Sequence, residues 1–256
     1  MARLSPGLRR ALTFGGQAPL PVGALIVAMV LATVGGTVWP PLGDGLVLLA
    51  PRLEAPTWVV LLEAWRLVTW PLVQERLPGS LITLFFAAFM LLWLGRQLSY
   101  AWSERRFVTR FFVLSAGAGA ATLAVLVPLG VPAAYFGIWA VLNALLVTWG
   151  LIFPSQRISW FGAVQMTGAT VARVFTVGTP VWAVVVGWSS LGLLGALVAY
   201  LPHLAAIGLA WLLVAGGPRR GWFRLQDWWQ RRTLERQRRK FKVISTDRPR
   251  PKEWMN

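Results

Sequence analysis

Six stretches of mostly apolar residues, separated by short polar breaks, dominate the pattern along this chain. They lie at 21–39, 80–98, 107–127, 132–153, 168–188 and 190–214. A helix that crosses a lipid bilayer needs about 20 predominantly apolar residues, and each stretch has roughly that length. The pattern therefore predicts an all-α polytopic membrane protein, a bundle of six transmembrane helices.

The segment between the first two stretches, about 40–79, is not a simple polar linker. Residues 46–49 and 58–62 are apolar but too short to span a bilayer, so we expect them to lie in the membrane interface. Proline and glycine at positions such as Pro40, Pro41 and Gly43 interrupt any longer helix. The sequence therefore predicts a compact interfacial loop built from short pieces.

Composition supports the membrane class and excludes some chemistry. Of 256 residues, 56% are apolar and only 13% charged, which is too apolar for an ordinary soluble domain. The chain has no cysteine, which excludes a disulfide, a thiol nucleophile and a Cys-ligated metal centre. With one histidine and no carboxylate inside the apolar stretches, we expect neither a metal site nor a cofactor.

The net charge of +16 is distributed unevenly, and its placement predicts the topology. Thirteen of the 25 Lys and Arg residues follow Gly217, and the connections after the second and fourth stretches are basic as well. Cytoplasmic loops carry an excess of Lys and Arg, so both termini are expected in the cytoplasm of a bacterium, with the bundle in its inner membrane. The first long loop, which is slightly acidic, is then expected outside.

The basic end of the chain forms a second region, 218–256, after a membrane domain of 1–217. Its aromatic and basic side chains alternate with helical periodicity, which predicts an amphipathic helix on the membrane surface. The candidate lipid or partner contacts are Trp222, Arg224, Trp228, Trp229 and Arg231. Because this segment follows a membrane helix directly, lipid headgroups or a protein are favoured over nucleic acid as its partner.

Several short motifs carry a resemblance to a known family. Trp65-Arg66 lies near the end of the first loop, Gly95 follows Leu92-Trp93-Leu94, and Arg106 precedes Phe107 after Trp102-Ser103. This arrangement resembles the rhomboid family of intramembrane serine proteases. The resemblance covers about residues 20–215 and implies a six-helix rhomboid-like bundle.

The catalytic motif of active rhomboids is Gly-x-Ser-Gly-Ala-x-Phe-Gly at the start of the fourth helix. Residues 130–137 are similar to it and retain Gly130, Ala134, Phe136 and Gly137. In this register Pro132 takes the place of the nucleophilic serine. Proline has no hydroxyl group but is suited to the first turn of a helix, so we expect it to open the fourth helix near His203.

The other catalytic positions implied by the resemblance are also degenerate. His203 corresponds to the histidine of the sixth helix, whereas Ala87 and Thr83 stand where the family has the asparagine and histidine that support the oxyanion. Loss of such donors alone costs about 2.7–4 kcal/mol of transition-state stabilisation. The sequence therefore predicts no catalytic residues and no protease activity.

These observations lead to an interpretation with two alternatives. The favoured one is an inactive rhomboid-like protein that binds other integral membrane proteins, as an assembly or quality-control factor or as a structural subunit. The first alternative is a residual intramembrane hydrolase in which a different hydroxyl group faces His203. The second, a small-solute transporter, is disfavoured because the apolar stretches contain almost no charged groups.

Overall fold

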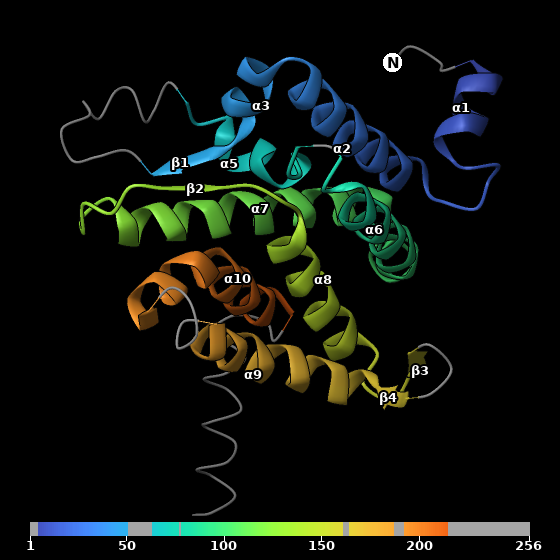
Figure 1. Ribbon diagram of the computed structural model, residues 1–256. Coiled ribbons are helices and arrows are strands. Elements are labelled where there is room, and N and C mark those ends of the chain that lie inside the picture. Colours follow the sequence, from blue (N-terminus) through green and yellow to red (C-terminus); the bar gives the residue numbers. More distant parts are fainter. Residues whose placement is uncertain (1–4, 51–62, 77, 161–163, 187–191, 215–256) are drawn as a thin grey trace, which may run out of the picture. The chain divides into compact units, whose positions relative to one another are not determined.

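A computed structural model describes residues 5–50, 63–76, 78–160, 164–186 and 192–214 (Figure 1). All of these residues belong to one structural unit that ends at Val214. The predicted surface helix, with Trp222, Arg224, Trp228, Trp229 and Arg231, lies outside the described residues, as does the apolar piece at 58–62.

The described part of the chain is mostly helical, and it contains five helices that are long and apolar enough to cross a membrane. These helices are α2 (Leu20–Val38), α6 (Leu81–Trp102), α7 (Glu104–Leu126), α9 (Gly168–Val186) and α10 (Gly192–Val214). A sixth apolar helix, α8 (Trp139–Ile152), is shorter, with 14 residues. The prediction of a helical, polytopic membrane protein is therefore confirmed, with five helices of spanning length in the described chain.

The start of α8 corrects the sequence prediction. The apolar pattern predicts a helix from residue 132, but Ala133–Tyr135 form strand β2 and the helix begins at Trp139. Gly137, with φ of +95°, ends the extended segment in a backbone conformation that L side chains rarely adopt. Pro132 therefore precedes a strand and does not open the fourth apolar helix. A short apolar run does not by itself distinguish a buried strand from a helix.

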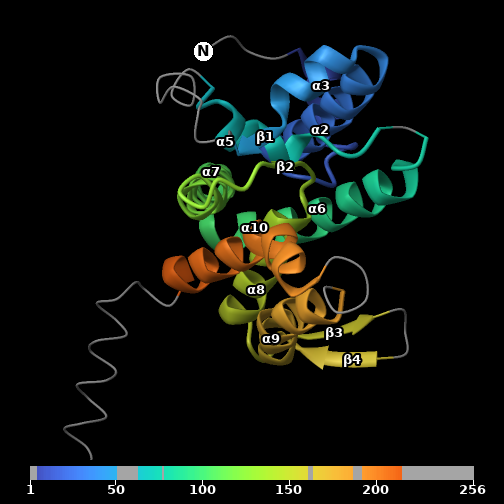
Figure 2. The same ribbon diagram turned by 60° about the vertical axis from the view of Figure 1, so that its left-hand side comes forward.

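Helix α8 is the most enclosed of the apolar helices. Ten of its 14 residues are buried, and Figures 1 and 2 show it between α6, α7, α9 and α10. Within the core, the rings of Trp93 on α6 and Trp149 on α8 lie 5.2 Å apart. The hydrophobic core is therefore organised around the shortest of the apolar helices.

Within the residues described, the first loop consists of short pieces. The loop contains α3 (Pro40–Leu46), β1 (Leu48–Ala50), α5 (Arg66–Thr69) and the 3-10 turn η1 (Trp70–Leu72). Elsewhere, α1 (Pro6–Leu12) precedes α2, and β3 (Arg157–Trp160) pairs with β4 (Val164–Thr167) between α8 and α9. The hydropathy pattern predicts none of these strands.

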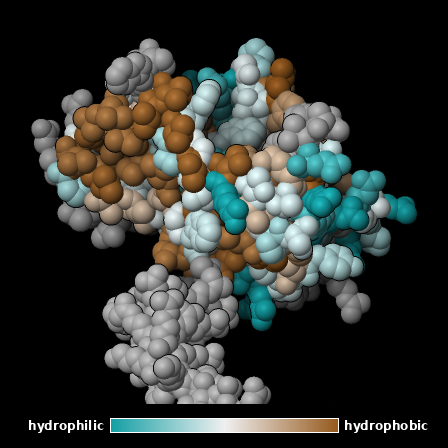
Figure 3. All heavy atoms as spheres, turned by 90° about the horizontal axis from the view of Figure 1, so that it is seen from below, coloured by the Kyte–Doolittle hydropathy of each residue, from teal (hydrophilic) through white to brown (hydrophobic). Residues whose placement is uncertain are grey.

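Large apolar side chains cover the outer surfaces of the long helices. Ile82, Phe85 and Phe89 are exposed on α6, and Val177, Val181 and Trp182 are exposed on α9. Figure 3 shows a broad hydrophobic area on one side of the face seen from below, with hydrophilic residues gathered on the other side. Exposed apolar surface of this extent is typical of helices that contact lipid.

Packing of α8 against α9 depends on two glycines. A Cβ atom added to Gly150 would overlap the backbone oxygen of Gly168, and one added to Gly168 would overlap the backbone oxygen of Phe153. Both obstacles are backbone atoms, which cannot move aside as a flexible side chain can. The two helices therefore meet at a distance that only glycine permits.

We predict that Gly150→Ala lowers the free energy of unfolding by about 1–3 kcal/mol, the usual cost of overpacking a core. Gly178→Ala is the matched control, because Gly178 lies on α9 with open space around its Cα and the change favours the helix. SDS-induced unfolding in mixed micelles, followed by tryptophan fluorescence, measures both. Equal stabilities for the two variants would contradict the close α8–α9 approach.

Candidate functional site

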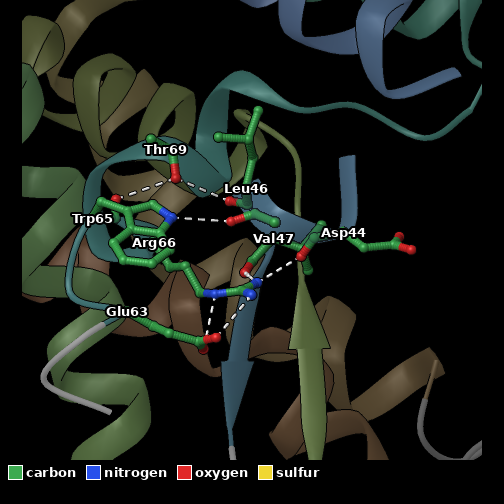
Figure 4. Close-up of polar contacts among 8 residues, drawn as sticks. Asp44, Leu46, Val47, Glu63, Trp65, Arg66 and Thr69 are labelled. Atoms are coloured by element: carbon green, nitrogen blue, oxygen red, sulfur yellow. Dashed lines mark hydrogen bonds and ion pairs between the residues drawn. The ribbon is translucent and has the colours of Figure 1, made fainter. Parts of the chain in front are cut away.

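The first loop is held together by side chains that cap the C-terminal end of α3. Trp65 Nε1 donates a hydrogen bond to the carbonyl oxygen of Gly45 at 3.1 Å, and Thr69 Oγ1 donates to that of Leu46 at 3.0 Å. Arg66 Nη1 donates to the carbonyl oxygens of Asp44 at 2.6 Å and Val47 at 2.8 Å (Figure 4). We call Trp65, Arg66 and Thr69 the loop clamp.

The reason for this clamp lies in the geometry of helix ends. The last four carbonyl groups of a helix have no intrahelical donor and must be satisfied from elsewhere. In α3 the clamp supplies donors to the carbonyls of residues 44–46 and to that of the capping residue Val47. Glu63 pairs with Arg66 Nε at 2.9 Å and neutralises its charge. The Trp-Arg pair singled out in the sequence therefore organises the loop, and its cation is already paired.

Hydrogen bonds also attach the loop to α7. Ser115 Oγ donates to the carbonyl oxygen of Leu67 at 3.0 Å, and Trp70 Nε1 donates to that of Ser115 at 3.3 Å. Trp70 and Ser115 are both buried. This reciprocal pair fixes the end of the loop on the bundle.

The clamped loop positions a two-stranded ribbon. Strand β1 follows α3 closely and pairs antiparallel with β2, Leu48 opposite Tyr135 and Leu49 opposite Ala134. Leu48 and Tyr135 point into the core, whereas Leu49 and Ala134 are exposed on the opposite face. The backbone N–H of Gly137 donates to the carbonyl oxygen of Val73 at 2.7 Å and so ties the end of the ribbon to the loop.

Two cavities adjoin the ribbon. The first, of about 470 Å³, has an almost entirely apolar lining from β1, residues 63–67, Leu123 of α7 and residues 132–134. The second, of about 480 Å³, extends toward α2 and α3 and includes the polar residues Thr33, Gln74 and Glu75. Leu49 and Ala134 contribute to both cavities, so the exposed face of the ribbon borders each of them.

Tyr135 connects this ribbon to α10. Its hydroxyl donates to the carbonyl oxygen of Val198 at 2.7 Å. In a regular helix that carbonyl would accept from the N–H of residue 202, but Pro202 has no N–H. A phenol is un-ionised at neutral pH, so its O–H is available as a donor. Tyr135 therefore replaces the hydrogen bond that Pro202 removes.

The predicted degenerate catalytic positions lie on different elements, with Thr83 and Ala87 on α6, Pro132 before β2 and His203 on α10. Pro132 lines the first cavity, whose described lining contains no residue of α10, although the sequence predicts it beside His203. Ala87 is fully buried on α6, and Thr83 is half-buried one turn earlier. The prediction that Pro132 opens the fourth helix is wrong, because β2 intervenes before α8 begins at Trp139. The proximity of Pro132 to His203 stays a prediction.

His203 lies on the buried side of α10, in register with the buried residues Ala196, Ile207 and Ala210. Its Nδ1 atom is buried and has no hydrogen-bond partner among the described residues. The ring lies 5.3 Å from that of Tyr200. The described residues therefore give this histidine no group that would orient it as a general base.

The remaining motif residues have mainly structural surroundings. Gly95 lies against Val22, where a Cβ atom would come within 2.7 Å of that side chain. Gly130 has a φ of +64° in the turn after α7. Ala134 is on the ribbon and Phe136 lines the second cavity, while Arg106 is exposed near the start of α7.

Sequence reasoning missed Tyr135, Thr69 and Ser115, which hold the ribbon and the loop in place. One signal was available, because Pro202 within an apolar helix predicts an unpaired carbonyl at Val198. No local pattern identifies the donor, which is 63 residues away in the sequence.

Comparison with known proteins adds no assignment. The chain matches no model of a known protein family and no curated protein. Among the described residues, His, Asp and Glu side chains form no group of three that could hold a metal ion.

We predict that Arg66→Met destabilises the protein by about 2–3 kcal/mol, because it removes the donor that two carbonyl groups and the Glu63 carboxylate share. Arg76→Met is the matched control. Arg76 pairs with Asp44, but both side chains are largely exposed, at 59% and 70%, so its loss should cost under about 1 kcal/mol. SDS-induced unfolding compares them, and equal losses would refute the clamp.

We predict that Tyr135→Phe destabilises the protein by about 1–3 kcal/mol, since the Val198 carbonyl then loses the donor that the structure gives it. In a Pro202→Ala background the same change should cost much less, because the backbone N–H restored at position 202 can donate to that carbonyl. A double-mutant cycle on the same unfolding assay measures this coupling. Additive effects would show that Tyr135 does not compensate for Pro202.

Proposed function

We propose that this chain is a proteolytically inactive, rhomboid-like membrane protein that binds other integral membrane proteins, as an assembly or quality-control factor or as a subunit of a complex. The observation that carries the proposal is the lack of a nucleophilic Ser, Thr or Cys side chain near the motif. From Gly130 to Val147 the chain contains no Ser, Thr or Cys. This stretch includes Pro132, where the motif places the nucleophile, and the first turns of α8, where the structure begins the helix. The lack of these side chains therefore holds for either position.

Two further features support the absence of catalysis. A serine hydrolase needs a base oriented by a third group and donors for the developing oxyanion. His203 has no hydrogen-bond partner at Nδ1 among the described residues, and the positions implied for the donors are Ala87 and Thr83. A threonine hydroxyl could donate one hydrogen bond, but alanine offers none.

The ribbon and its two cavities support binding. The first cavity is lined mostly by apolar side chains, and the one cation in its described lining, Arg66, is already paired with Glu63. Such a lining favours apolar segments of a partner over charged solutes. The exposed residues Leu49 and Ala134 would contact a partner that occupies either cavity.

The proposed topology includes α8 as a sixth membrane span, with both termini in the cytoplasm of a bacterium. At 1.5 Å per residue, 14 residues extend only about 21 Å, less than the roughly 30 Å hydrocarbon core. Non-helical backbone within a membrane is tolerated where protein surrounds it. The enclosure of α8 by its neighbours and the pairing of β2 with β1 are consistent with this requirement.

Photo-crosslinking tests the binding proposal in cells. A photoreactive residue at Leu49 should give a discrete adduct with an integral membrane protein, and the same partner should be captured from Ala134. Phe85, exposed on the outer surface of α6, is the matched control and should not capture that partner. Arg66→Met should abolish the adduct. Identical adducts from Phe85 would contradict a site at the ribbon.

Activity-based labelling tests the lack of catalysis separately. We predict that neither the natural chain nor Pro132→Ser and Ala140→Ser variants react with a fluorophosphonate probe, because a lone hydroxyl group is a weak nucleophile without a positioned base and oxyanion donors. Labelling of the natural chain that disappears in His203→Ala would overturn the proposal and indicate a residual hydrolase.

A further inference from the structure

The connection between α6 and α7 presents a tryptophan and two arginines close together. The guanidinium carbon of Arg110 lies 3.9 Å from the centre of the Trp102 ring, a cation–π arrangement. Stacking on the ring fixes the guanidinium plane while its N–H groups at the edge stay free to donate hydrogen bonds. Trp102 is the last residue of α6, and Arg110 lies on α7.

Arg106 shares this surface. It precedes Arg110 by four residues, so the two side chains lie on the same face of α7, about 40° apart around the helix axis. Around the helix axis, Glu104 is about 160° from Arg106 and about 120° from Arg110, so it faces away from both. Among the described residues the ion pairs are Arg66–Glu63 and Arg76–Asp44, both in the first loop. Within that part of the chain, Arg106 and Arg110 therefore have no carboxylate to neutralise them.

The backbone keeps this pair close to the end of two membrane helices. Ser103 alone separates α6 from α7, and its φ of +80° is a strained conformation for a residue other than glycine. A one-residue connection leaves little freedom between Trp102 and the first turns of α7. Tryptophan at the end of an apolar helix is typical of the membrane interface, where lipid headgroups lie.

We propose that Trp102, Arg106 and Arg110 form a binding site for the phosphate group of an anionic phospholipid. Two guanidinium groups on one helix face offer several N–H donors to phosphate oxygens, and arginine binds phosphate through its planar fork. The ring of Trp102 orients Arg110, and the neighbouring apolar helix surfaces would contact the acyl chains. This site is separate from the ribbon, and it does not depend on the proposed function.

Native mass spectrometry of the full chain in detergent micelles tests the site. Titration with phosphatidylglycerol and with phosphatidylcholine gives the concentration at which each lipid is retained. We expect the natural chain to retain phosphatidylglycerol at concentrations about tenfold lower than phosphatidylcholine, in line with the attraction of arginine to anionic lipid. Arg106→Gln combined with Arg110→Gln should abolish this preference.

Arg105→Gln is the matched control, because it removes the same charge from the same helix but lies about 100° from Arg106 and 140° from Arg110. It should keep the preference for phosphatidylglycerol, whereas Trp102→Leu should weaken it severalfold. Should the double variant fail to fold, Arg106→Gln alone is informative, since Arg106 is exposed. An equal loss in Arg105→Gln would show a general charge effect and overturn the site.

Inorganic phosphate distinguishes the lipid from a soluble source of the same chemistry. If millimolar phosphate does not displace phosphatidylglycerol, the lipid assignment stands. If phosphate binds the natural chain and the chain shows no preference between the two lipids, the site belongs to a soluble phosphate compound and the lipid proposal fails.

Discussion

Backbone carbonyl groups that lack a helical donor determine how the first loop and the β1–β2 ribbon of this protein are built. A membrane-embedded chain has little water with which to satisfy such groups, so each must find a donor inside the protein. The C-terminal end of α3 obtains its donors from Trp65, Arg66 and Thr69. The carbonyl of Val198, which lost its donor to Pro202, obtains one from Tyr135. Both sets of hydrogen bonds join segments that are far apart in sequence, and both involve residues in or next to the β1–β2 ribbon.

This arrangement explains how a short helix can occupy the centre of the bundle. Because the loop clamp fixes β1 and β1 pairs with β2, the non-helical backbone that leads into α8 is held by hydrogen bonds to protein. Helix α8 then needs fewer residues than its neighbours, and most of those residues contact other helices. The two cavities adjoin the ribbon, and Leu49 and Ala134 line both of them.

Features that depend on composition can be predicted from this sequence, whereas features that depend on tertiary pairing cannot. The long apolar helices follow from hydropathy, and this prediction agrees with the described residues. Proline and glycine in the first loop lie among the short elements α3, β1, α5 and η1. The strand at 133–135 has an apolar sequence that fits a helix equally well, and only its partner at 48–50 makes it a strand. For the same reason, the sequence predicts that Pro132 opens a helix, whereas that helix begins at Trp139. Trp65 and Arg66 were identified through resemblance, but their role became apparent only from the carbonyls that they contact.

Catalysis, which we propose is absent, and the frame formed by the loop clamp and the β1–β2 ribbon have different physical requirements. Nucleophilic catalysis needs a hydroxyl group, a base and oxyanion donors placed to within a fraction of an ångström, and replacing any of them with an apolar side chain is compatible with stable packing. The frame needs donors for buried carbonyls, and removing one leaves a cost that nothing nearby offsets. In this chain, Ala87 is fully buried in the core, whereas Arg66 and Tyr135 each satisfy a carbonyl group that depends on them. The proposed binding surface requires only the frame, so the proposal that a partner occupies the cavities at the ribbon does not depend on a nucleophile.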